Sequence, residues 1–257
     1  MGLESGPENR SSWAMVTGSS RGIGKATAFA LARDGWNVVI HSRSLGPPLH
    51  EVLATIEGMG QRAIGVAANL AHENASAELV EEAWNKTGGI SAWVHFAGAD
   101  LLTGPEAKRP FSEKMKLITT VDLWGTMLVC RDVGQRMFDA GRGTIVTMGW
   151  DQASTGMEGD SGELFAAIKG GVMSFTRSLA KSLAPKVRVN CIAPGWIKTA
   201  WGEQASQVWQ DRVFRETPLQ RWGLPEDIAE MTRFLVSPSA AYVTGQILNV
   251  NGGAVCH

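Results

Sequence analysis

Tyrosine is nearly absent from this chain of 257 residues, in which Tyr242 is the single copy. The residue four positions after Tyr242 is Gln246, so a Tyr-x-x-x-Lys arrangement is excluded. Cysteine is also scarce: Cys130, Cys191 and Cys256 lie far apart, without Cys-x-x-Cys spacing. That pattern disfavours a disulfide framework and a zinc site. We expect three buried thiols, with catalysis or metal binding as the alternative.

The sequence also lacks a long apolar run and a surplus of charge of either sign. No stretch of about 18 apolar residues occurs, and the polar N-terminus has no apolar core of a signal peptide. The 24 basic and 25 acidic residues leave a net charge of −1, so no nucleic-acid or membrane partner is expected. These absences predict a cytoplasmic protein that binds a small molecule and further copies of itself.

The sequence does contain an alternation of short apolar runs and amphipathic stretches. Strands are predicted at 13–17, 37–41, 63–67, 92–96, 144–148, 187–192 and 246–250, and the clearest helices at 24–34, 112–140 and 164–183. This alternation is typical of parallel sheets. We expect an α/β fold: a single-domain Rossmann-type doubly wound parallel sheet of about seven strands with helices on both faces. The domain is expected to span 12–257, after a disordered segment at 1–11.

A glycine-rich loop follows the first predicted strand. In Thr17-Gly-Ser-Ser-Arg-Gly-Ile-Gly24, three glycines stand between that strand and a helix. Because glycine has no Cβ, backbone N–H groups and the positive end of the helix can approach a pyrophosphate. A glycine-rich loop alone can be a simple turn, but this context favours a dinucleotide site.

The end of the second predicted strand indicates which dinucleotide is bound. The segment reads His41-Ser-Arg-Ser44 and offers no carboxylate for the ribose 2′-hydroxyl of NAD. Arg43 and Arg21 are suited to bracket a 2′-phosphate through charge-assisted hydrogen bonds. NADP(H) is therefore expected in preference to NAD(H), and solvated surface arginines are the alternative.

These and further motifs resemble the short-chain dehydrogenase/reductase family along nearly the whole chain, and most of all its 3-oxoacyl-acyl-carrier-protein reductases. The further motifs are Ala97-Gly98, Pro194-Gly195-x-Ile197-x-Thr199 and the segment 242–253. The resemblance implies a homo-oligomer, tetramer or dimer, built on the two long helices. The expected cofactor-binding residues are Gly18, Ser20, Arg21, Gly22, Ile23, Gly24, Ser42, Arg43, Asn69, Leu70, Ala97, Gly98, Lys169, Pro194, Gly195, Ile197 and Thr199.

The catalytic half of the family pattern is altered. In the family a Tyr donates a proton, a Lys four residues later lowers the pKa of that Tyr and binds the nicotinamide ribose, a Ser orients the carbonyl and an Asn holds a water relay. Here Phe165 stands at the Tyr position and Trp150 at the Ser position. Asp122 stands at the Asn position, and Lys169 is retained. Ser154 and Ser161 are alternatives for the Ser, because the loop after Trp150 is long for the family.

Ordinary carbonyl reduction is therefore not expected, since a positioned proton donor contributes about 10²–10⁴-fold. We expect either an oxidoreductase whose substrate needs no Tyr proton, such as an activated C=C or C=N bond, or a catalytically silent NADP(H)-binding, sensing or partner subunit. Asp122, Asp151, Glu163 and His95 are candidate replacement acids, and we favour Asp151. The alternatives are a helix kink at Asp122, a solvated acidic loop at Asp151 and Glu163, and a packed strand residue at His95.

Tryptophan, with ten copies, is abundant. Trp150, Trp196, Trp201, Trp209 and Trp222 are expected near the substrate side, either as an aromatic pocket for an apolar or aromatic ligand or as core. In the family the stretch 201–215 forms a mobile lid, and here Trp201, Val213 and Phe214 are expected to close over the ligand, with core packing as the alternative. The expected catalytic set is Lys169, Asp122, Phe165, Trp150 and Asp151, and no metal is expected.

Overall fold

Seven parallel strands form one sheet in the computed structural model, which describes residues 12–101 and 105–256. The strands lie in the order β3-β2-β1-β4-β5-β6-β7, and each pairs in parallel with its neighbour. Their bounds are β1 Trp13–Thr17, β2 Asn37–Ser42, β3 Ala63–Ala67, β4 Ala92–His95, β5 Gly143–Met148, β6 Val187–Pro194 and β7 Ile247–Val250. The predicted fold class is confirmed.

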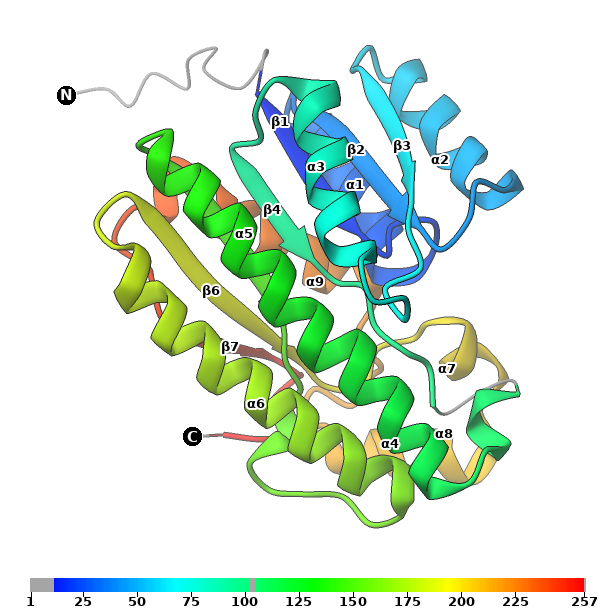
Figure 1. Cartoon of the computed structure of the whole chain (residues 1–257). Helices are drawn as coiled ribbons and strands as arrows, with labels where there is room; N and C mark the ends of the chain where they lie inside the picture. The colour runs from blue at the N-terminus through cyan, green and yellow to red at the C-terminus, as the bar shows by residue number, and fades with distance from the viewer. Residues whose placement is uncertain (1–11, 102–104, 257) are drawn as a thin grey trace, which may run out of the picture.

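Helices cover both faces of this sheet (Figure 1). One face carries α3 (Ala75–Thr87), α5 (Thr126–Asp139) and α6 (Asp160–Leu183), which share a core with the strands. The other carries α1 (Gly22–Arg33), α2 (Pro47–Gly58) and α9 (Pro225–Val236). Shorter helices lie beyond one edge of the sheet: α4 Phe111–Ile118, α7 Ala200–Gln204 and α8 Gln207–Glu216. No helix among the described residues is both long and apolar enough to cross a bilayer.

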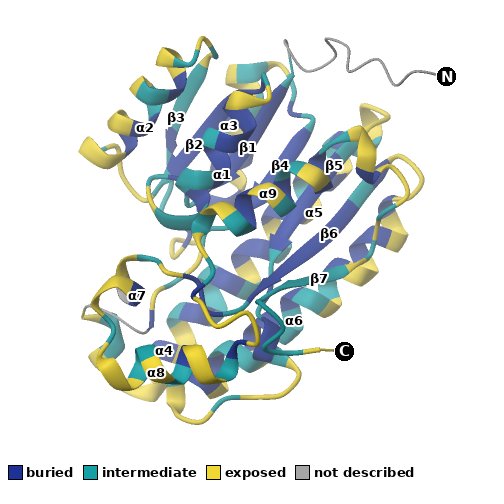
Figure 2. Cartoon of the chain, turned by 180° about the vertical axis from the view of Figure 1, so that it is seen from behind, coloured by how far each residue is buried: buried dark blue, intermediate teal, exposed yellow. Residues whose placement is uncertain are grey.

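The inner strands are buried because both of their faces are covered, as Figure 2 shows in dark blue, whereas the edge strands β3 and β7 are mostly half-buried. Successive side chains of β1 point to opposite faces: Met15 packs in the cluster under α3, α5 and α6, while Ala14 and Val16 pack in the cluster under α1, α2 and α9. All three are fully buried. A central strand with two covered faces accounts for the continuous apolar run in the sequence.

The strand order reverses direction between β1 and β4. The chain builds outward from β1 through β2 to β3, and then crosses to the other side of β1 to continue with β4. The loops after β1 and β4 therefore diverge at the carboxyl edge of the sheet and leave a crevice between them. In doubly wound sheets ligands bind at this position.

Two predicted helices differ in detail from the structure. The helix predicted at 112–140 is divided into α4, a π-helical turn at Thr119–Gly125 (η2) and α5, and α6 begins at Asp160 rather than at 164. Three short 3₁₀ turns complete the chain, η1 Glu106–Lys108, η3 Asp151–Ala153 and η4 Pro238–Ala240. The expectation of disorder at 1–11 falls on residues outside those described.

The cysteines divide into two kinds. Cys130 and Cys191 are buried, and burial raises the pKa of both thiols, to about 11 for Cys191. The expectation of a buried thiol is wrong for Cys256, which is exposed because it lies in the C-terminal tail beyond β7. No group of His, Cys, Asp and Glu side chains suited to hold a metal occurs within the described residues.

Candidate functional site

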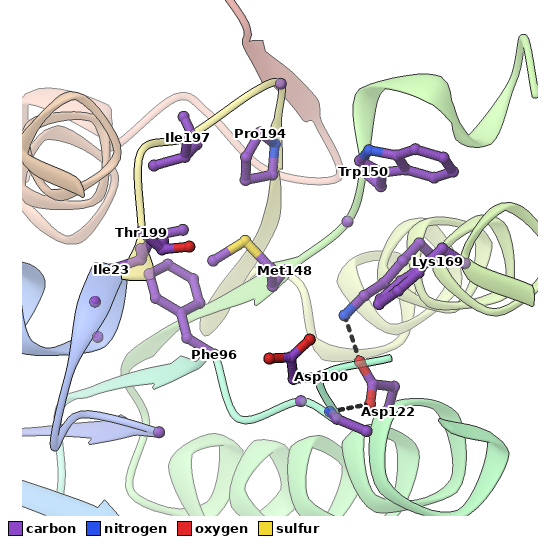
Figure 3. A pocket seen from close by; sticks show the side chains of 18 of the residues that line it. Ile23, Phe96, Asp100, Asp122, Met148, Trp150, Lys169, Pro194, Ile197 and Thr199 are labelled. Carbon is purple, nitrogen blue, oxygen red and sulfur yellow. Dashed lines mark hydrogen bonds and ion pairs between the residues drawn. The ribbon is translucent and has the colours of Figure 1, made fainter. Parts of the chain in front are cut away.

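A cavity of about 470 Å³ opens at the carboxyl edge of the sheet (Figure 3). Its walls come from the glycine-rich loop after β1, the loop after β4, the π-helical turn η2, the end of β5, the first half of α6 and the segment after β6. These segments lie far apart in the sequence, and the parallel sheet brings their ends to one edge. The cavity therefore occupies the crevice that the strand order predicts.

The glycine-rich loop is braced against β2 by a network that sequence reasoning missed. The Gly18 N–H donates to His41 Nδ1 at 3.2 Å, and His41 Nε2 donates to the Ala68 carbonyl at 2.9 Å. The Ser19 hydroxyl donates to the Val16 carbonyl at 2.6 Å and accepts from the His41 N–H at 3.0 Å. Burial lowers the pKa of His41, which keeps the ring neutral and able to accept from the loop.

Backbone contact explains the third glycine of the loop. A Cβ at Gly24 would overlap the Gly18 carbonyl oxygen, so the first turn of α1 can pack against the loop in this way only with glycine. Arg21, the N-cap residue of α1, makes no side-chain cap, and the first turn of the helix contains no acidic residue. The N-terminal N–H groups of α1 thus remain available for an anion.

Lys169 and Asp122 form a buried ion pair at the opposite wall. Lys169 Nζ lies 2.8 Å from Asp122 Oδ2, and the two side chains are 10% and 1% exposed. The geometry is that of an ion pair rather than of an aligned hydrogen bond. Asp122 Oδ1 accepts the Ala99 N–H at 2.7 Å, which ties η2 to the loop after β4 (Figure 3). A Cβ at Gly98 would lie 2.7 Å from Asp122 Oδ2, so a larger residue there would push the carboxylate out of its present position.

Two aromatic side chains form the wall beside Lys169. Trp150 follows β5 and Phe165 lies in the second turn of α6; their ring centroids are 6.2 Å apart, edge to face at 60°. Both line the cavity and are half-buried. Ser154 and Ser161 are not among the described lining residues, and the Ser161 hydroxyl donates to the Leu101 carbonyl at 3.1 Å. The side chains beside Lys169 are therefore mainly aromatic rather than hydroxylic.

Asp151, the preferred replacement acid, is buried but does not line the cavity. Its Oδ2 accepts from Asn251 Nδ2 at 3.1 Å, while its Oδ1 is buried without a hydrogen-bond partner among the described residues. Burial raises the pKa of this carboxyl to about 6, against the lowering effect of the Asn251 hydrogen bond. The alternative of a solvated acidic loop is wrong for Asp151 and correct for Glu163, which is exposed in the first turn of α6.

His95 is a packed strand residue, which was the alternative to a role as replacement acid. It is buried at the end of β4, with Nδ1 3.3 Å from the Thr17 hydroxyl. Burial, aided by His41 and Lys169, lowers its pKa to about 3. A ring that stays neutral at all ordinary pH values cannot store a proton for catalysis.

The expected cofactor residues fall into two groups. Those that line the cavity are Gly18, Arg21, Gly22, Ile23, Gly24, Gly98, Lys169, Pro194, Gly195, Ile197 and Thr199. Ser20, Ser42, Arg43, Asn69, Leu70 and Ala97 lie outside it, and Leu70 belongs to the core under α3. The cavity also has lining residues that sequence reasoning did not assign, which are Phe96, Ala99, Asp100, Met148, Gly149, Met157 and Ala200. For Asp100 the sequence did contain one indication, since this residue lies in the loop that follows β4.

The tryptophans divide between the cavity and a separate packing cluster. Trp150 and Trp196 line the cavity, whereas Trp209 and Trp222 pack against Trp196 at 5.4 and 6.5 Å between ring centroids. Val213 is buried in this cluster, which fixes α8 to the segment after β6. Core packing therefore accounts for Val213, while Phe214 is 48% exposed and the Trp201 side chain lies outside the description.

Comparisons with known proteins agree with this architecture. A family model described as Enoyl-(Acyl carrier protein) reductase matches residues 18–255. The chain is 36% identical over 245 residues to 3-oxoacyl-[acyl-carrier-protein] reductase of Synechocystis sp., covering 94% of this chain and 96% of that protein. It is 36% identical over 244 residues to the reductase FabG of Aquifex aeolicus, covering 93% and 95%.

Solved structures match equally far along the chain. A protein of Sinorhizobium meliloti described as a short-chain alcohol dehydrogenase superposes with a TM-score of 0.85 at 32% identity, covering 95% of this chain and 96% of that one. A short-chain type dehydrogenase/reductase of Mycobacterium ulcerans gives a TM-score of 0.85 at 29% identity, covering 96% and 91%. Since sequence and structure both match over nearly their full length, the chain belongs to the short-chain dehydrogenase/reductase family of oxidoreductases.

Proposed function

We propose that this protein is an NADP(H)-binding oxidoreductase with an atypical active site, which acts on a substrate that needs no tyrosine proton donor. The observation that carries the proposal is the cavity itself: it joins the glycine-rich loop at one end to Lys169, Trp150 and Phe165 at the other. A bound dinucleotide requires the glycine-rich loop, and a substrate that reacts beside its nicotinamide requires space at the other end. NADP(H) supplies hydride chemistry when bound.

The residues fit a nicotinamide dinucleotide. The uncapped N-terminus of α1 and the glycine-rich loop suit its pyrophosphate, and the segment from Pro194 to Thr199 forms the wall opposite Lys169. Lys169 is proposed to bind the nicotinamide ribose, with Asp122 holding its ammonium in place. Asp151 faces Asn251 instead of the cavity, so we assign it no contact with substrate.

The preference for NADP(H) rests on two arginines. Because β1 and β2 are paired in parallel, the glycine-rich loop and the residues after β2 lie at the same edge of the sheet. Arg21 and Arg43 are both exposed there, and the nearby Ser42 hydroxyl is bonded to the Ser44 carbonyl at 2.6 Å. Two guanidinium groups at this edge favour a phosphate over a free 2′-hydroxyl. The 3-oxoacyl-[acyl-carrier-protein] reductases among the relatives make a reductase direction the natural expectation.

A catalytically silent NADP(H) sensor or partner subunit is the second candidate, and the ion pair is the observation that favours it. An ammonium bound to Asp122 at 2.8 Å is less free to assist chemistry than an unpaired one. Met115, Trp124 and Leu128, which are 47%, 62% and 43% exposed along α4, η2 and α5, support a homo-oligomer. The cytoplasmic location remains a prediction.

Calorimetric titration of nucleotide-free protein with NADPH and with NADH tests the cofactor. Tight NADPH binding with much weaker NADH binding supports the proposal, and binding of neither contradicts both candidates. The double substitution Phe165→Tyr, Trp150→Ser then tests the site. Ketone reductase activity in the double variant would mean that the rest of the site is intact, whereas continued inactivity would mean that the pocket is reshaped as well.

A further inference from the structure

His41 lies where three segments around the proposed nucleotide site meet. It belongs to β2 and is 2% exposed. Its Nδ1 lies 3.2 Å from the Gly18 nitrogen in the glycine-rich loop after β1, and its Nε2 lies 2.9 Å from the Ala68 carbonyl oxygen after β3. One imidazole ring therefore connects the residues that follow β1 and β3 to the end of β2.

These two contacts fix the protonation state of the ring. The Ala68 carbonyl can only accept a hydrogen bond, so Nε2 must carry a hydrogen atom. The Gly18 N–H can only donate, so Nδ1 must present its lone pair. Both bonds therefore require a neutral ring. A second proton, on Nδ1, would place one donor against another and leave a buried cation between two backbone groups.

The surroundings of His41 also oppose a charged ring. Burial lowers its pKa, and the hydrogen bond to Ala68 raises it by less. The neighbouring His95 on β4 stays neutral, because burial and the proximity of His41 lower its pKa to about 3. Both ring nitrogens of His41 have backbone partners, so among the described residues neither is paired with a carboxylate.

The charged side chains at this end of the sheet do not favour protonation of the ring either. Lys25 of α1 and Glu51 of α2 are paired with each other at 2.9 Å. Glu73, in the loop after β3, is exposed to solvent, which screens its charge. Arg21 and Arg43 are cations at the same edge of the sheet, so they would repel a protonated ring.

Gly18 is the residue through which the ring acts on the nucleotide site. Its φ is +66°, and a Cβ there would lie 3.0 Å from Ala97 Cα, so it is held between His41 of β2 and the loop after β4. The loop N–H groups and the N-terminus of α1, which are proposed to hold the pyrophosphate, follow directly. Without the bond to Nδ1 these donors would lose the fixed orientation that anion binding needs.

We propose that His41 is a positioning residue for the nucleotide: as a neutral ring it holds the glycine-rich loop, and on taking up a proton it releases both the loop and the nucleotide. His41 itself is buried and does not line the cavity. Because the neutral ring is the binding form and burial lowers its pKa from 6.5, affinity should be complete above about pH 6.5 and fall at lower pH. This role rests on the proposed function and adds an acid limit to its nucleotide binding.

Two substitutions at this position separate the hydrogen bonds from the charge. His41→Leu removes both bonds, whereas His41→Asn keeps an acceptor near the position of Nδ1 but cannot become charged. Calorimetry at pH 7.5 uses NADP⁺ as the probe, because NADPH decomposes in acid. Kd should rise about tenfold in His41→Leu and about threefold in His41→Asn. His50→Asn is the matched control, since His50 is exposed on α2, and it should leave Kd unchanged.

The pH profile distinguishes positioning from structural support alone. The 2′-phosphate of NADP⁺ also titrates near pH 6, so the measured quantity is the Kd of the unmodified protein divided by the Kd of His41→Asn at the same pH. This ratio should be about 0.3 at pH 7.5 and constant down to about pH 6.5. Below the pKa of His41 it should rise by up to about tenfold per pH unit. The same ratio taken with His50→Asn should stay near 1, and circular dichroism at each pH checks that the proteins remain folded.

The two proposals fail in different ways. Absence of NADP⁺ and NADPH binding to the unmodified protein refutes the proposed function, while hydrogen exchange of nucleotide-free protein at pH 7.5 still tests the loop, because residues 17–24 should exchange faster in His41→Leu. If the nucleotide binds but His41→Leu binds it within twofold as tightly, or the Kd ratio stays constant down to pH 4.5, the role of His41 alone is wrong. Equal exchange of residues 17–24 in both proteins would likewise overturn it.

Discussion

The ion pair between Lys169 and Asp122 should contribute measurably to stability, because neither partner is well solvated. Asp122 is 1% exposed and the Lys169 side chain 10% exposed. Removing one partner of a buried pair costs about 3–5 kcal/mol, since the other charge is left without compensation. Asp122→Asn keeps an oxygen for the Ala99 N–H and leaves an ammonium at the cavity edge, so we expect a loss of about 2–3 kcal/mol.

Lys169→Met should cost more, about 3–4 kcal/mol, because it leaves a more deeply buried carboxylate whose Oδ2 has no other partner among the described residues. The double variant should be more stable than the sum of the two losses predicts, by about 2 kcal/mol or more, since each single change leaves a charge that the double change removes. For a chain of this length, 1 kcal/mol shifts Tm by about 2–4 °C.

Urea unfolding at pH 7, followed by tryptophan fluorescence and circular dichroism at one fixed protein concentration, measures this cycle. The coupling should change little between about 0.1 and 1 M NaCl, because buried charges are weakly screened. Single variants that each lose less than about 0.5 kcal/mol and add independently would refute the reasoning, since they would mean that water already solvates both charges.

The structure also predicts the effect of three further substitutions on stability or nucleotide binding. Burial raises the pKa of Asp151 from 3.8 to about 6, so this carboxyl destabilises the folded state as pH rises from about 4 through 6. Asp151→Asn should therefore be more stable than the unmodified protein at pH 8, by up to about 3 kcal/mol, and equally stable near pH 3. Unfolding free energies of the two proteins that change in parallel with pH would contradict this. Arg43→Ala should raise the Kd for NADPH roughly 10–100-fold and leave that for NADH within twofold, whereas equal losses for both would remove the 2′-phosphate assignment. Gly24→Ala should abolish nucleotide binding and lower Tm, because its Cβ would overlap the Gly18 carbonyl, while Gly58→Ala, whose Cβ would have open space in α2, should bind normally.

The strands were predictable because their signal is local. Short apolar runs separated by helices require a parallel sheet, and each predicted strand lies within two residues of an observed one. The single helix predicted at 112–140 was less accurate, because the π-helical turn at Thr119–Gly125 depends on contacts from outside it. Asp122 in that turn is bound by the Ala99 N–H and paired with Lys169, which belong to two other segments of the chain.

The site residues also divide into those that local sequence predicts and those that depend on distant contacts. Spacing placed the glycine-rich loop, Lys169 and Phe165, since motif distances along one helix or loop survive folding unchanged. The loop position of Asp151 suggested a solvated carboxylate, yet it is buried against Asn251, which lies 100 positions away in the sequence. Contacts over that separation leave no trace in local composition.

By itself, then, the sequence determined the parallel sheet, the crevice at the reversal of strand order, the dinucleotide loop and the loss of the phenol, because each follows from residue type and short-range spacing. Tertiary structure alone decided the charge of the cavity. Lys169 is neutralised by Asp122, Asp151 is turned away, and Asp100 points inward, since separate strand ends meet at one edge of the sheet. Coulombic effects depend on distance and burial, and folding sets both.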